Sequence, residues 1–174
     1  MALQYSSGIY KIATWAHITN AHPIPGPSIV KGLSSVGLPL GRGLLLLSEM
    51  STAGSLAVGA YTEEAVRMAR QHRDFVIGFI AQRRMDGIGT NPQKDVSDED
   101  FLVLTPGISL ESATDTMGQQ YRTPRAAVLE CGSDVVIVGR GIYGKPPYSA
   151  ETISTRAGHY MSEGWKAYLD RLSG

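Results

Sequence analysis

The 174-residue sequence has only one cysteine, Cys131, so it cannot form an internal disulfide bond. A lone thiol after an apolar run is typical of a small buried residue at the end of a helix, and it predicts a reducing, cytoplasmic location. The longest apolar run, around Leu44–Leu47, is too short to cross a bilayer. Polar residues directly after Leu3 predict that no signal peptide is present.

The sequence also lacks an excess of charge of either sign. Its 16 basic and 16 acidic residues cancel, so composition gives no argument for a nucleic-acid or membrane partner. Any anion must therefore be held by a local site. His17, His72 and His159 have no partners at metal-ligand spacing, and we predict no metal site.

What the sequence does have is enough apolar material for a core. Hydrophobic residues make up 43% of the chain and charged residues 18%, as in folded α/β proteins. We see no low-complexity segment or dividing linker. The exception is the polar stretch 85–100, whose glycine and proline residues predict a surface loop. We predict one domain over residues 1–174.

Five short apolar segments have the composition of buried parallel strands. The last four are almost continuously apolar, as expected where helices cover both faces of a sheet. The first is more polar. The segments are Ala16–Asn20, Gly43–Glu49, Phe75–Gln82, Phe101–Gly107 and Val135–Gly141.

Helical patterns lie between these segments, each with a start or stop residue or an apolar stripe. Thr62 is predicted to cap the helix over Glu63–His72. The predicted helices are Gly8–Trp15, Ser28–Ser35, Glu63–His72, a helix started by Thr123 and Pro124 and ended by Gly132, and Ile153–Leu172.

The alternation repeats about every 30 residues, the length of one strand–helix unit. It predicts either a doubly wound sheet or a (β/α)8 barrel. Five strands cannot close such a barrel, which needs eight. On the pattern alone, an open five-stranded sheet that binds phosphate is also possible.

The sharpest local motif is Val138-Gly139-Arg140-Gly141, at the end of the last predicted strand. Glycine lets a ligand approach the backbone, and arginine offers a fork of donors suited to phosphate. The other predicted strands also end in polar or special residues, and α/β sites are built at that edge. A tight turn with a solvated arginine is the competing interpretation. His22, before Pro23, is interpreted as a turn residue.

Several long motifs, in order along the chain, carry a family resemblance. They run from Gln4 to the end and include Leu47–Ala57, Asp74–Gln82, Leu104–Gly107, Gly118–Thr123 and Ile137–Tyr143, with Tyr5–Ala13 and Ile18–His22 upstream. Together they resemble orotidine 5'-phosphate decarboxylase of the fungal type.

The resemblance implies an incomplete (β/α)8 TIM barrel, strands 4–8 with their helices, in a family that works as a homodimer. That family converts orotidine 5'-monophosphate to UMP and CO2 without a cofactor. It also implies the following substrate-binding residues: Gly139 and Arg140 on the 5'-phosphate, Gln119 and Tyr121 closing over it, Ser51 at the pyrimidine and Pro106 lining its pocket.

The sequence departs from the family in two respects: the first three strands of the barrel are not matched, and the catalytic motif is absent. The family places a lysine between two aspartates, in an Asp-x-Lys-x-x-Asp motif, and no such motif occurs among these 174 residues. We therefore predict no catalytic residue in this chain. Three interpretations stay open: a complete decarboxylase whose sequence is truncated here, a non-catalytic remnant that binds UMP or another phosphate ligand, and the C-terminal half of a split enzyme.

Overall fold

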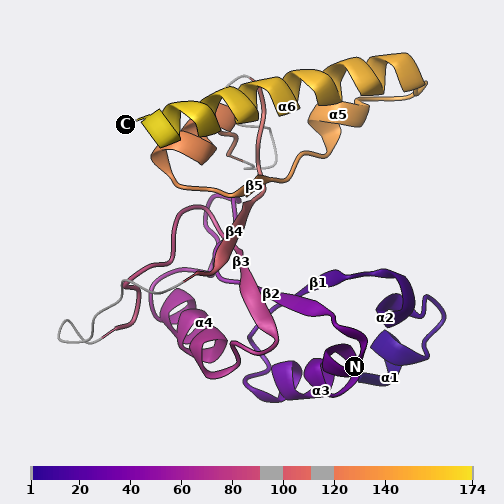
Figure 1. The fold of residues 1–174 in the computed structure, drawn as a ribbon, viewed down its shortest axis with the longest axis vertical. Helices are drawn as coiled ribbons and strands as arrows, with labels where there is room; N and C mark the ends of the chain where they lie inside the picture. The colour runs from indigo at the N-terminus through magenta and orange to yellow at the C-terminus, as the bar shows by residue number, and fades with distance from the viewer. Residues whose placement is uncertain (1, 91–99, 111–119, 174) are drawn as a thin grey trace. The chain divides into compact units, whose positions relative to one another are not determined.

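The computed structural model describes residues 2–90, 100–110 and 120–173 (Figure 1). The chain divides into two compact units, which are described separately. The first unit contains residues 1–49, 56–80 and 85–102, and the second contains residues 50–55, 81–84 and 103–174. The prediction of one domain over residues 1–174 stays a prediction.

The first unit is built on three parallel strands. They are β1 (Ile18–Ala21), β2 (Gly43–Leu47) and β3 (Val76–Ile80), with β2 pairing with both neighbours. Its helices are α1 (Ala2–Ser6), α2 (Ile12–Trp15), α3 (Ser28–Gly37), the 3₁₀ turn η1 (Leu38–Leu40) and α4 (Ala60–Gln71).

The core of this unit lies between the strands and their helices, with α4 packed on β2 and β3. Leu44, Leu46 and Phe79 are completely buried there. Within β3, a Cβ added at Gly78 would lie 2.1 Å from the carbonyl oxygen of Leu102. Only glycine therefore allows the backbone at Leu102 to approach so closely.

The second unit contains β4 (Leu102–Thr105, from its second residue on) and β5 (Val135–Val136), which pair in parallel. The π-helical turn η2 (Ala126–Glu130), the short α5 (Arg140–Tyr143) and the long α6 (Ala150–Ser173) complete it. In Figure 1, α6 is the long yellow helix at the C-terminal end. It contacts both α5 and η2.

All five predicted strands are present, which confirms the α/β class. Three local predictions were wrong. The helix predicted over Gly8–Trp15 is interrupted, because Lys11 adopts a left-handed conformation with φ 43° directly before α2. Thr62 lies inside α4 instead of capping it, and its buried hydroxyl donates to the carbonyl of Ser48 at 3.0 Å. The last strand ends at Val136 instead of Gly141.

Candidate functional site

The structure brings two of the predicted phosphate-binding residues into direct contact. Nη2 of Arg140 donates a hydrogen bond to the hydroxyl of Tyr121 at 2.8 Å. Gly139 lies directly before α5, and its carbonyl accepts from the amide of Ile142 at 2.9 Å. The backbone turns away from the β5 direction here, so Arg140 starts a helix and does not continue a strand.

Two further predicted residues are tied to the same unit through their backbones. The amide of Gln120 donates to the carbonyl of Ser51 at 3.0 Å, which places residues 50–55 beside the Tyr121 segment. The carbonyl of Pro106, just after β4, accepts from Nε2 of Gln82 at 3.4 Å. Gln119, the remaining predicted residue, lies outside the described residues.

Arg122 links the segments that contain Gln82, Gly107 and Cys131, and the sequence motifs did not predict this role. Its Nη1 donates to the carbonyl of Gln82 at 2.6 Å and contacts Sγ of Cys131 at 3.3 Å. Its backbone amide donates to the carbonyl of Gly107 at 2.9 Å. The one sequence signal for this role is that Arg122 follows Tyr121 in the Gly118–Thr123 motif, because a single arginine shows no periodic spacing.

The last residue of β4, Thr105, has a side-chain hydroxyl with no hydrogen-bond partner among the described residues. The side chain of Thr105 is fully buried, and within residues 2–90, 100–110 and 120–173 its Oγ1 has no hydrogen-bond partner. A buried hydroxyl without a partner is unfavourable by about 1–3 kcal/mol.

A separate polar contact follows β1 and β2 in the first unit. The hydroxyl of Tyr61 donates to the carbonyl of Leu47 at 3.0 Å and lies 3.5 Å from Nδ1 of His22. Burial raises the pKa of Tyr61 above its usual value of 10.0, so the phenol stays protonated and acts as a donor. His22 lies directly after β1, where a turn residue was predicted.

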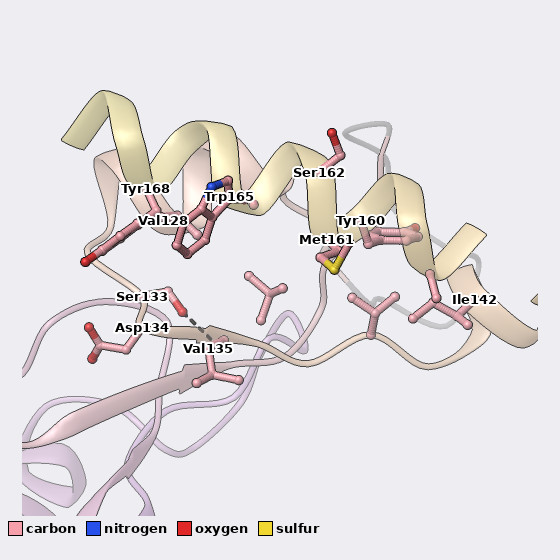
Figure 2. A pocket seen from close by; sticks show the side chains of 14 residues that line it. Val128, Ser133, Asp134, Val135, Ile142, Tyr160, Met161, Ser162, Trp165 and Tyr168 are labelled. Carbon is pink, nitrogen blue, oxygen red and sulfur yellow. Dashed lines mark hydrogen bonds between the residues drawn. The ribbon is translucent and has the colours of Figure 1, made fainter. Parts of the chain in front are cut away.

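An apolar groove of about 1010 Å³ lies between α6 and the β5 region (Figure 2). Val135 and Val136 line it on one side, and Tyr160, Met161 and Trp165 line it on the other. Met161 is 73% exposed and Trp165 is 61% exposed, so much of the apolar stripe predicted on this helix faces solvent. Exposed apolar surface of this kind is typical of interaction sites.

Neither a metal site nor a membrane span emerges from the described part of the chain. No three His, Cys, Asp or Glu side chains gather there in a way that could hold a metal ion. None of the described helices is long and apolar enough to cross a bilayer.

Comparison with known proteins identifies the family. The family model described as "Orotidine 5'-phosphate decarboxylase / HUMPS family" matches residues 1–153. The chain belongs to this family. The family resemblance found from the motifs is thereby confirmed.

Named relatives agree with this assignment. An orotidine 5'-phosphate decarboxylase from Schizophyllum commune is 68% identical over 173 residues, which are 99% of this chain and 62% of that protein. One from Rhizopus oryzae is 55% identical, covering 98% of this chain and 60% of that protein. The uridine 5'-monophosphate synthase of Bos taurus is 48% identical, over 98% of this chain and 32% of that protein. The chain thus spans about 60% of the length of its fungal decarboxylase relatives.

A solved structure establishes the fold. The crystal structure of orotidine 5'-monophosphate decarboxylase from Sulfolobus solfataricus matches with a TM-score of 0.60 at 17% identity, covering 94% of this chain and 70% of that one. The prediction of an incomplete barrel in the decarboxylase family is therefore confirmed.

Proposed function

We propose that this chain provides the phosphate-binding part of an orotidine 5'-phosphate decarboxylase, acting in UMP formation in the cytoplasm. The observation that carries the proposal is the contact of Arg140 with Tyr121 at 2.8 Å. It joins the two side chains that family resemblance assigns to the 5'-phosphate. A guanidinium is a planar fork of N–H donors, and this geometry suits phosphate oxygens.

The other substrate-binding roles are proposed from the same resemblance. Ser51 contacts the pyrimidine, Pro106 lines its pocket, Gly139 offers its backbone to the phosphate, and Gln119 closes over it. The backbone bonds of Ser51 to Gln120 and of Pro106 to Gln82 support a common location for the ring contacts. Binding energy from a remote phosphate can stabilise a transition state at a distant carbon.

Decarboxylation in this family depends on a motif that these 174 residues do not contain. Negative charge develops on a ring carbon, and an ammonium must stabilise it and then supply a proton. No Asp-x-Lys-x-x-Asp motif occurs among the 174 residues. We propose that these residues decarboxylate only together with a segment that carries such a lysine.

The apolar groove favours completion by such a segment over a non-catalytic remnant. Val135 is 45% exposed on β5, and within the second unit β5 pairs only with β4 among the described strands. A βα segment that added a strand beside β5 would cover Met161 and Trp165 and extend the sheet towards the eight strands of a closed barrel. The DNA upstream of Met1 separates the interpretations. An in-frame Asp-x-Lys-x-x-Asp sequence supports one continuous enzyme, and a separate gene with that motif supports a split one.

UMP binding tests the phosphate site without requiring catalysis. We expect the chain to bind UMP in calorimetry and the Arg140→Ala variant to bind about 10- to 100-fold more weakly, since a charge-assisted bond contributes about 1.5–3 kcal/mol. Arg125→Ala is the matched control, because Arg125 is a surface arginine of the same unit, paired with Asp170. No UMP binding, or an equal loss in both variants, would contradict the proposed site.

The exposed groove predicts self-association when the 174 residues are purified alone. Trp165→Gln is expected to shift the chain towards monomer in sedimentation velocity, because it removes an apolar side chain from the groove. Trp15→Gln is the matched control, since Trp15 is 63% exposed and Trp165 is 61% exposed. A wild-type chain that stays monomeric at micromolar concentration would disprove this prediction, as would an equal shift in the two variants.

A further inference from the structure

A second pocket lies on the α6 side of Arg140 and has a different character from the apolar groove. It encloses about 690 Å³, between residues 109–110, α5, the segment that follows α5, and the first turns of α6. Neither Tyr121 nor Gly139 is among its described lining residues, although Arg140 is. The pocket therefore adjoins the proposed phosphate site and extends beyond it.

The described lining of this pocket is positively charged. It contains Arg140, Lys145 and Arg156, and none of its described residues is acidic. Within the described residues, Lys145 and Arg156 form no salt bridge. Glu151 is the closest acidic residue along α6 and is exposed. Two cations free of a carboxylate partner favour an anion in the pocket.

Arg156 lies against the backbone of the segment that follows α5. A Cβ added at Gly144 would lie 2.2 Å from Nη1 of Arg156, and Gly144 has φ +69°. The guanidinium therefore rests directly on the glycine backbone, in a space that any side chain would fill. Glycine here both adopts the positive φ without strain and leaves room for Arg156 beside the pocket.

Tyr160 supplies a buried donor on the same lining. The residue is 5% exposed, and its hydroxyl oxygen accepts from the amide of Leu110 at 3.3 Å. Among the described residues, no acceptor is recorded for the hydroxyl proton itself. A Cβ at Gly141 would come within 2.3 Å of this hydroxyl, so a second glycine keeps it uncovered. A buried O–H with no acceptor favours an anionic ligand atom nearby.

We propose that this pocket binds a diphosphate group, held by Lys145, Arg156 and the hydroxyl of Tyr160, with Arg140 shared between it and the phosphate site. The three lining cations match a group that carries several negative charges. Two sources supply this chemistry: free pyrophosphate and a nucleoside diphosphate. The nucleotide case rests on the proposed function, whereas the free diphosphate case does not.

Calorimetry with inorganic pyrophosphate tests the pocket on the whole 174-residue chain. We expect binding that weakens about tenfold in Arg156→Gln, as for loss of one charge-assisted contact. Lys166→Gln is the matched control, because it removes one positive charge from α6 at a residue outside the pocket lining. Thermal melts of both variants show whether they fold. Absence of pyrophosphate binding to the wild-type chain overturns the proposal, and so does an equal loss in the two variants.

Comparison of UDP with UMP distinguishes the two sources of the diphosphate. Tighter binding of UDP than of UMP, lost in Arg156→Gln, supports a nucleoside diphosphate. Arg156-dependent binding of pyrophosphate without a preference for UDP supports the free group. Failure of UMP to bind removes the proposed function alone, because pyrophosphate binding is measured independently.

Discussion

A direct spectrophotometric assay of the purified 174-residue chain with orotidine 5'-monophosphate is expected to show no turnover above the uncatalysed background. A positioned general acid contributes about 10²–10⁴-fold, and electrostatic stabilisation of developing charge contributes about 10²–10³-fold per donor. The Asp-x-Lys-x-x-Asp lysine would supply both effects, and the sequence lacks that motif. Phosphate binding at Arg140 would not replace it, because the role proposed for Arg140 is to hold the phosphate and not to act on the ring.

Complementation sharpens this prediction. Adding a polypeptide with the first barrel strands and the Asp-x-Lys-x-x-Asp motif is expected to restore turnover, whereas the same polypeptide with its lysine changed to alanine is not. Turnover by the 174 residues alone would show that another group of this chain acts on the ring carbon. It would disprove the proposal that decarboxylation needs a further segment with the motif lysine.

The Leu46→Ala variant is expected to lose about 2–5 kcal/mol of unfolding free energy. Leu46 is completely buried in β2, where it pairs in register with Phe79 of β3. Truncation removes apolar contacts and leaves a cavity that a rigid sheet cannot fill. Urea unfolding followed by circular dichroism measures the change.

Leu56→Ala is the matched control for this measurement. Leu56 belongs to the same unit but is 91% exposed, so the same chemical change should alter the unfolding free energy by no more than about 0.5 kcal/mol. Similar losses in the two variants would mean that burial of β2 does not govern the stability of the first unit.

The strand pattern was predictable because buried parallel strands are continuous apolar runs. Gly43–Leu47 and Val76–Ile80 lie inside the segments predicted from composition alone. The errors lie where tertiary contacts override local preference. Thr62 has the chemistry of a helix cap, but its hydroxyl is used by the carbonyl of Ser48, a partner 14 residues away.

The same limit applies to the end of the last strand. Val138 continues an apolar run that favours a strand, yet β5 stops at Val136. The backbone must turn there for Gly139 and Arg140 to reach α5 and the hydroxyl of Tyr121. A run of apolar residues does not reveal where a chain leaves a sheet.

The candidate site was predictable only in part. Motif resemblance identified Tyr121 and Arg140, which the structure places in contact. It gave no indication of Arg156 or Tyr160. A single arginine on a helix is usually solvated, and a single tyrosine is usually part of the core. Their proximity to Gly144 and Gly141 depends on how the chain folds back after α5.

The bonds made by Arg122 bear on the order of events during folding. Its guanidinium joins the carbonyl of Gln82 across a sequence separation of 40 residues, and the second unit draws on three separate stretches of chain. Closing such long loops costs conformational entropy before the contacts that reward it can form. We therefore expect the proposed substrate-binding face to assemble late, after the more local helices. In pulse-labelling hydrogen exchange, the amide of Arg122, which donates to Gly107, should gain protection more slowly than the amides of α4.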